Sequence, residues 1–188
     1  MDFQIEMTGF DEEMRRLEKF PQVAQRELIR AMEQSVRVVE AEVKPLTPVG
    51  VSSMLRNSIG SEVMASLGGT IIGRIGSSMK NEVYPKVMEF GREPGHWISP
   101  EGMESLIRWV HVKGLAGTYS TKTRRRKGSQ FNQLVEDATV AGAIAMAIYR
   151  RGIKGRHFLS GGFNRANGRV IGFFESAMMR IAKQVMND

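Results

Sequence analysis

The stretch from residue 21 to residue 46, PQVAQRELIRAMEQSVRVVEAEVKPL, decides the fold class expected for this chain. Its apolar residues recur at intervals of three and four, at Ile29, Met32, Val36, Val39, Val43 and Leu46. This spacing places them along one side of an α-helix. Pro21 suits a first helical position, and Pro45 and Pro48 favour an end to the helix. Because the stripe is shorter than about three heptads, it predicts a helix packed on a core rather than a coiled coil.

Strands are predicted on both sides of this helix. Residues 2–7 alternate apolar and polar side chains, which is typical of a half-buried strand, and residues 11–20 are consistent with a short helix. After an expected loop at 47–57, residues 58–66 and 70–77 have strand character. Leu67-Gly68-Gly69 lies between them and can supply the positive φ of a tight hairpin.

The second half of the sequence is predicted to be mainly helical. A helix is expected over 100–112, with Ser99 as its N-cap and Pro100 at its first position. An Ala-rich helix is expected over 131–151, and an amphipathic helix over 170–185. Glycines are expected to break the chain between these last two helices, including Gly161 and Gly162.

This order of elements predicts an α+β fold. We expect a small antiparallel sheet packed against a long N-terminal helix and a C-terminal helix, with a helical insert and a basic loop. The length of 188 residues fits one domain over 1–188. Within it, 100–151 is interpreted as the helical insert and 114–130 as its exposed, mobile basic loop.

Composition excludes several classes of site. The chain has no Cys and only three His, at positions 96, 111 and 157, so thiolate chemistry is excluded and a His-rich metal site is not expected. No signal peptide is expected at the start of the chain. The longest near-apolar run, 138–149, is shorter than the roughly 20 residues of a membrane span. It is interpreted as a buried helix, and we expect no cofactor, metal or membrane partner.

The sequence offers only weak candidates for a pair of catalytic side chains. Glu89 and Glu93 could be imagined as an acid–base pair, and His157 and Ser160 as a base and a nucleophile. Glu93 lies in a Gly/Pro loop and is expected to be a surface carboxylate, as is Glu89. No orienting acid or oxyanion hole is evident beside Ser160. The sequence therefore does not predict an enzyme.

Charge is distributed unevenly along the chain, whose net charge is +7. Residues 1–50 carry 7 Lys/Arg and 10 Asp/Glu, whereas residues 111–188 carry 14 and 4. The strongest local feature is a run of five cations in six positions, Lys122, Arg124, Arg125, Arg126 and Lys127. Such a run can neutralise phosphates without reading sequence, face a neighbouring subunit, or simply keep an exposed loop solvated.

Four segments resemble the head–tail joining, neck or tail-completion proteins of long-tailed bacteriophages. The helix ends in Leu-Thr-Pro-Val-Gly at 46–50, and Met-Leu-Arg-Asn-Ser-Ile follows at 54–59, where the family typically reads P-V-[DK]-T-G-x-L-R-x-S-I. The sequence YPKVMEFG at 84–91 is similar to Y-A-x-x-V-E-F-G, and GRHFL at 155–159 is similar to R-P-F-L. Segments 106–110 and 145–154 resemble an insert that many members carry.

The resemblance implies which residues are structurally important. The family-motif residues are Leu55, Arg56, Tyr84, Glu89, Phe90, Gly91, Phe158 and Leu159. Among these, Tyr84, Phe90, Phe158 and Leu159 are interpreted as core anchors. Glu89 is expected either to hydrogen-bond a local backbone group or to pair with an Arg of a neighbouring subunit.

The resemblance also implies a structural function. Members form a ring, expected here to hold six copies with twelve as the alternative, at the head–tail junction of the virion. The ring contacts head-closure and tail proteins and leaves a channel for DNA, which the basic loop could contact. The protein would be made in the host bacterial cytoplasm. Open alternatives are a basic nucleic-acid-binding protein that uses 122–127, and a tail terminator or minor tail protein.

Overall fold

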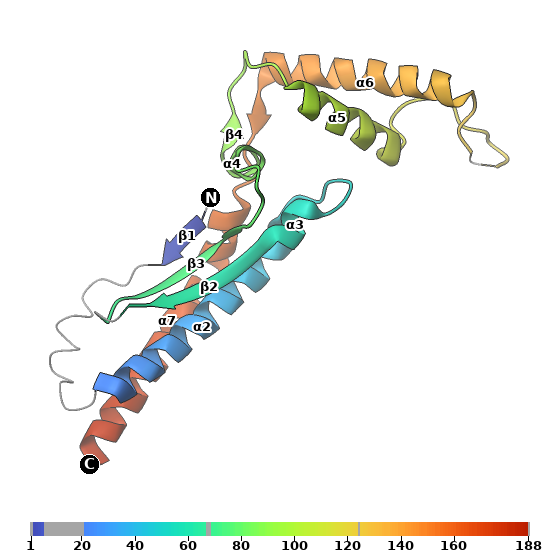
Figure 1. Cartoon of the computed structure of the whole chain (residues 1–188). Helices are drawn as coiled ribbons and strands as arrows, with labels where there is room; N and C mark the ends of the chain where they lie inside the picture. The colour runs from blue at the N-terminus through green and yellow to red at the C-terminus, as the bar shows by residue number, and fades with distance from the viewer. Residues whose placement is uncertain (1, 6–20, 67–68, 124, 188) are drawn as a thin grey trace.

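The computed structural model describes residues 2–5, 21–66, 69–123 and 125–187. It shows the predicted α+β fold, drawn in Figure 1 as a body of paired long helices and a sheet with a helical arm at one end. The elements, in chain order, are β1 (Asp2–Ile5), α2 (Pro21–Leu46), α3 (Met54–Ser58), β2 (Ile59–Ala65), β3 (Ile71–Ser77), α4 (Val83–Phe90), β4 (Gly91–Arg92), α5 (Pro100–Lys113), α6 (Gln130–Arg151), β5 (Ile153–Lys154) and α7 (Phe158–Asn187).

The three-stranded sheet of the body has the order β1-β3-β2, and both of its pairings are antiparallel. The predicted hairpin is confirmed, since β2 and β3 pair along their whole length, from Ile59 opposite Ser77 to Ala65 opposite Ile71. Strand β1 confirms the predicted first strand over 2–5. Residues 6–7 of that prediction, and the helix predicted at 11–20, lie outside the described residues.

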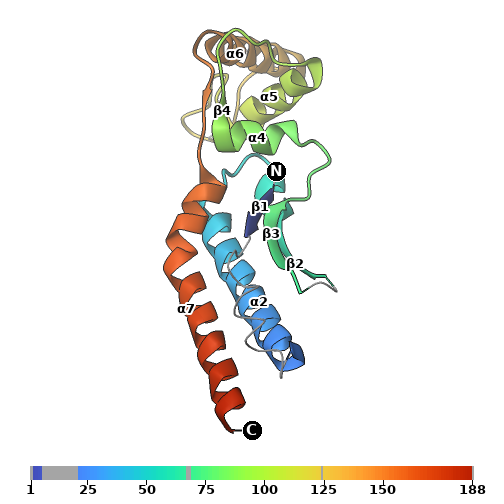
Figure 2. The same ribbon diagram turned by 90° about the vertical axis from the view of Figure 1, so that its left-hand side faces the viewer.

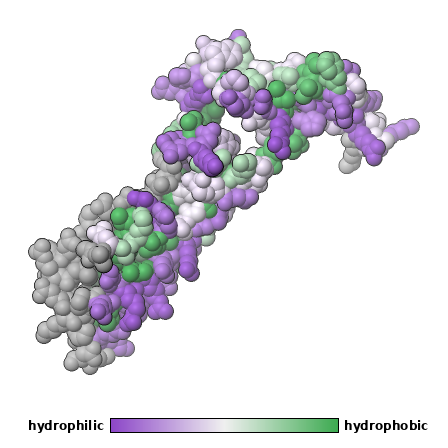
Figure 3. All heavy atoms as spheres, in the orientation of Figure 1, coloured by the Kyte–Doolittle hydropathy of each residue, from purple (hydrophilic) through white to green (hydrophobic). Residues whose placement is uncertain are grey.

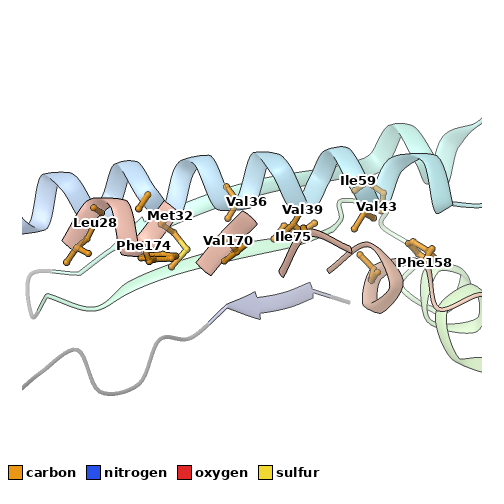
Figure 4. Packing of buried hydrophobic residues seen from close by; sticks show 14 of the residues in the cluster. Leu28, Met32, Val36, Val39, Val43, Ile59, Ile75, Phe158, Val170 and Phe174 are labelled. Atoms are coloured by element: carbon orange, nitrogen blue, oxygen red, sulfur yellow. The ribbon is translucent and has the colours of Figure 1, made fainter. Parts of the chain in front are cut away.

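Helix α2 confirms the predicted bounds of the long helix, and its inner face forms the core shown in Figure 4. Met32, Val36, Val39 and Val43 are almost fully buried, as their spacing predicted. The prediction is wrong at Ile29, which is only half-buried, because Leu28 faces the core in its place. Strands β2 and β3 pack against this helix, so burial of its apolar face joins the sheet to the helices.

Helix α7 begins at Phe158, twelve positions before the predicted helix start, and runs beside α2 (Figure 2). The predicted chain break at Gly161 and Gly162 is therefore wrong. A Cβ on Gly162 would lie 2.4 Å from Val43 Cγ2 and 2.8 Å from Val43 Cα. The glycine thus allows α2 and α7 to approach closely, because any side chain there would meet the backbone of α2.

The buried side of α7 is otherwise as predicted. Val170, Phe174, Ala177 and Ile181 all belong to the core cluster that α2 and the sheet share. The predicted fifth member of this stripe, Val185, has a side chain outside the described part of the chain. The predicted loop at 47–57 is wrong at its end, where Met54 begins the short helix α3.

Helices α5 and α6 form a hairpin, here called the arm, that extends from the body (Figure 1). Ser99 caps α5 as predicted, because its hydroxyl accepts a hydrogen bond from the Gly102 N–H at 3.2 Å. A small separate cluster of Val110, Ala116 and Ala141 holds the hairpin together. The predicted burial of 138–149 is wrong in part, since Ala141 and Ala145 are buried but Met146 is 37% exposed.

Candidate functional site

A two-stranded ribbon joins the body to the arm. Strand β4 leads out of the body and β5 leads back into it, with Gly91 opposite Lys154. Gly91 has φ of +88°, and a Cβ there would lie 2.4 Å from the Ile153 carbonyl oxygen. A Cβ on Gly155 would lie 2.5 Å from the Glu89 carbonyl oxygen. These glycines allow the two chains to pack backbone to backbone at the base of the arm.

The carboxylate of Glu89 caps the N-terminus of α7. Its Oε2 accepts a hydrogen bond from Leu159 N–H at 2.8 Å, and its Oε1 accepts bonds from Ser160 N–H at 3.1 Å and Ser160 Oγ at 2.8 Å. The side chain is 0% exposed. A carboxylate suits this place because the first N–H groups of a helix have no partner within the helix. Glu89 therefore connects α4 to a helix that begins about seventy residues later in the chain.

This arrangement corrects the predictions made for Glu89 and its neighbours. Glu89 bonds backbone groups, but distant ones, and it is buried rather than a surface carboxylate beside the exposed Glu93. Ser160 Oγ is a hydrogen-bond donor to that carboxylate. The two oxygens of Glu89 are thus used in holding α7, which gives this cluster a structural role.

The four predicted core anchors divide into two groups. Phe158 and Leu159 are each 1% exposed, which confirms their place in the core. Tyr84 is 38% exposed and Phe90 is 59% exposed, so the prediction that they fill the core is wrong. The cause is helical geometry, because α4 turns Glu89 inward and its neighbour Phe90 then faces about 100° away.

The other motif residues lie where the chain leaves α2. Leu55 is 2% exposed and belongs to the core of the body. Arg56 Nη2 donates a hydrogen bond to the Thr47 carbonyl oxygen at 3.3 Å. Thr47 is buried, and its hydroxyl donates in turn to the Val43 carbonyl oxygen at 2.9 Å. The first two family motifs are therefore in contact and close the end of α2.

An ion-pair cluster lies at the far end of the arm. Arg126 Nη1 donates to both carboxylate oxygens of Asp137, at 2.8 and 2.9 Å, and Arg126 Nη2 donates to Glu136 at 2.9 Å and to the Gln133 carbonyl oxygen at 3.0 Å. His111 Nδ1 lies 2.8 Å from Asp137 Oδ2. Asp137 is 1% exposed, and the Arg126 side chain is 9% exposed. One member of the basic run is therefore turned inward.

The cluster also sets the protonation of its members. Burial alone would raise the pKa of Asp137, but the hydrogen bonds from Arg126 and His111 outweigh it and hold that pKa below its usual value. The hydrogen bond to Asp137 raises the pKa of Arg126. Asp137 and Arg126 thus stay charged and paired near neutral pH. The sequence patterns did not single out Asp137, although an acid directly before the apolar run 138–149 was a visible signal.

The basic loop is a hydrogen-bonded turn between α5 and α6. Tyr119 and Arg126 form a β-bridge. The Ser120 N–H donates to the Arg125 carbonyl oxygen at 2.9 Å, and the Lys127 N–H donates to the Thr118 carbonyl oxygen at 2.8 Å. Lys122, Arg125 and Lys127 are exposed, whereas Arg124 lies outside the described residues. The structure therefore separates the predicted run into outward cations and one inward anchor.

Replacing Asp137 by Asn should destabilise the arm and leave the body folded, because Arg126 and His111 lose the charge that holds them. Both tryptophans of the chain report on this region. Trp97 stacks on Tyr149 of α6 with ring centroids 4.5 Å apart, and Trp109 packs against the cluster of the arm. We expect the urea midpoint measured by tryptophan fluorescence to fall, with little change in the helical circular dichroism of α2 and α7. The matched Glu136→Gln variant should show a smaller effect.

The ion pair between Arg126 and Asp137 also predicts how the stability of the arm depends on pH. The pKa of Asp137 is lowered in the folded protein, so its stabilisation is complete above the usual aspartate pKa of about 3.9. That stabilisation is lost as the pH falls through the lowered folded-state value. Below pH 4, the urea midpoint measured by tryptophan fluorescence should therefore fall more steeply with decreasing pH in the native chain than in Asp137→Asn. Parallel curves for the two proteins would contradict the assignment.

Comparison with known proteins gives one match. Residues 11–91 match the model of the HK97-gp10-like family, described as "Bacteriophage HK97-gp10, putative tail-component". This segment of the chain is therefore similar to phage tail components. The match covers α2 to α4 and ends at Gly91, so the arm and α7 lie beyond it. No curated protein and no solved structure matched the chain.

This relationship confirms the resemblance that the motifs indicated, at the level of a phage head–tail or tail-related family. A tail component is a structural part of the virion and contacts other virion proteins. Among the described helices, none is both long and apolar enough to cross a membrane. Among the described residues, no three or more His, Cys, Asp or Glu side chains are grouped so that they could hold a metal ion.

Proposed function

We propose that this phage tail-related protein forms a ring at the head–tail junction, where it joins the tail to the head and leaves a channel for DNA. The match of residues 11–91 to a tail-component family carries this proposal. Six copies are proposed, as the motif resemblance implied. Its neighbours would be head-closure and tail proteins, and it would be made in the host bacterial cytoplasm. Tail terminator and minor tail protein are the alternatives within the same virion.

The shape of the chain supports assembly with further copies. The arm extends from the body and leaves apolar side chains at its surface (Figure 3). Phe131 is 73% exposed, Leu134 58% and Val135 50%. Ile107 and Leu134 also line a hollow of about 600 Å³ between α5 and α6. Exposed apolar surface of this extent is typical of protein–protein contact sites, and we propose the neighbouring copy as its occupant.

Charge complementarity supports the same occupant. The first fifty residues carry an excess of acidic side chains, and residues 111–188 carry an excess of basic ones. A ring needs a heterologous contact, in which one surface of a subunit meets a different surface of the next. Opposite charges on the two surfaces favour that contact over like-with-like pairing. We therefore propose that the basic C-terminal part of one copy meets the acidic N-terminal part of the next.

Sedimentation of the purified protein tests self-assembly. We expect a closed complex of six copies, and we expect a double substitution, Phe131→Ser with Val135→Ser, to shift it to the monomer. The matched control is Ile171→Ser with Met179→Ser, because these apolar residues of α7 are similarly exposed, at 51% and 67%. The control variant should still form the complex of six copies. Equal loss in both variants would contradict the role of the arm, and a native chain that stays monomeric at all concentrations would contradict self-assembly.

A further inference from the structure

Four exposed cations lie at the end of α5 and in the loop that follows it. Lys113 ends α5, and Lys122, Arg125 and Lys127 lie in the loop that follows it. All four are exposed, and none takes part in an ion pair found among the described residues. The two carboxylates nearest the loop in sequence, Glu136 and Asp137, are already bonded to Arg126. We call these four residues the cationic tip.

The cationic tip has a defined backbone. The Tyr119–Arg126 bridge and the hydrogen bonds at Ser120 and Lys127 close the loop on itself. Gly117 has φ of +89°, and a Cβ there would lie 2.3 Å from Arg126 Nε, so the chain turns tightly around that side chain. Arg126 then fixes the loop to α6 through the buried Asp137. The loop thus presents its outward cations from a braced support, which lowers the entropy lost on binding.

We propose that the cationic tip binds the phosphate backbone of double-stranded DNA without sequence preference. Phosphate contacts need cations within reach of an anionic backbone, and the tip supplies four in a short span of chain. An acidic protein surface is the competing partner. Lysine is depleted at protein–protein interfaces, and three of the four cations are Lys113, Lys122 and Lys127, so DNA is the better fit. This binding does not depend on the ring, since a monomer carries the same tip.

Fluorescence anisotropy with a labelled 20-base-pair duplex tests the proposal. The logarithm of the affinity should fall linearly with the logarithm of the salt concentration, with a slope of about −0.9 for each phosphate neutralised. For the triple variant Lys122→Ser, Arg125→Ser, Lys127→Ser we expect a slope smaller in magnitude by about 2 to 3 and an affinity at least about tenfold weaker at low salt. Arg126 is left in place so that the loop keeps its support.

The matched control removes three exposed cations from the body, with Arg37→Ser, Arg165→Ser and Lys183→Ser. Its slope and affinity should stay close to those of the native chain. Equal weakening in both variants would assign binding to total charge and overturn the role of the tip. A native chain that does not bind the duplex at low salt, or a polyglutamate peptide that displaces the duplex as well as unlabelled DNA does, would overturn the assignment of DNA as the partner. These outcomes do not depend on whether the protein forms a ring, so they are distinguishable from the sedimentation result.

Discussion

Glu89→Ala should lower the free energy of unfolding by about 3 kcal/mol, because two buried backbone N–H groups and a hydroxyl lose their acceptor. Loss of a helix N-cap costs about 0.5–2 kcal/mol, and a buried donor left without a partner costs about 1–3 kcal/mol. The donors are Leu159 N–H, Ser160 N–H and Ser160 Oγ. The quantity to measure is the urea unfolding midpoint, read from the helical circular dichroism of the body.

Glu93→Ala is the matched control, since Glu93 is an exposed carboxylate close to Glu89 in sequence. Its stability should stay within about 0.5 kcal/mol of the native chain. The stability of Glu89→Gln should lie between those of Glu89→Ala and Glu93→Ala, because the amide keeps one acceptor oxygen but turns an N–H₂ group toward other donors. A Glu89→Ala protein as stable as the control would show that the start of α7 does not depend on the cap.

Gly162→Ala should destabilise the protein by about 1–3 kcal/mol, even though alanine is the better helix former. The new methyl group would lie 2.4 Å from Val43 Cγ2 and 2.8 Å from the Val43 backbone nitrogen. Helices α2 and α7 would have to move apart along the whole contact on which the core depends. The measurement is again the urea midpoint, together with the slope of the transition.

A Gly→Ala substitution elsewhere in α7 should have the opposite effect on stability. A Cβ on Gly168 meets nothing within 4 Å. Gly168→Ala should therefore stabilise the protein by up to about 1 kcal/mol through helix propensity alone. The pair isolates the effect of the close helix contact from that of the helix backbone. If Gly162→Ala stabilised the chain as Gly168→Ala does, the close crossing of α2 and α7 would be wrong.

Local patterns were sufficient to predict most elements of this fold. The spacing of apolar residues from Met32 to Val43 predicted the inner face of α2, because burial follows helical period. Ser99 and Pro100 predicted the start of α5, because capping depends on only a few neighbouring residues. The hairpin of β2 and β3 followed from two strand-like runs around a Gly-Gly turn.

Long-range contacts explain where prediction failed. Gly162 was interpreted as a helix breaker, because a sequence does not show that the Val43 backbone lies against it. Glu89 bonds residues about seventy positions away, and no local pattern marks that pairing. At the candidate site, Arg126 looked equivalent to its basic neighbours. Only the fold brings the buried Asp137 beside it and leaves Lys122, Arg125 and Lys127 outside.

The position of the protein in the virion tests the central proposal most directly. A small tag placed after Asp188, at the end of α7 opposite the arm in Figure 1, can be labelled with gold and located in purified particles by electron microscopy. We expect label at the head–tail junction in every complete particle. Label at the distal tip or along the tail, or particles without the protein, would contradict a ring that joins the tail to the head.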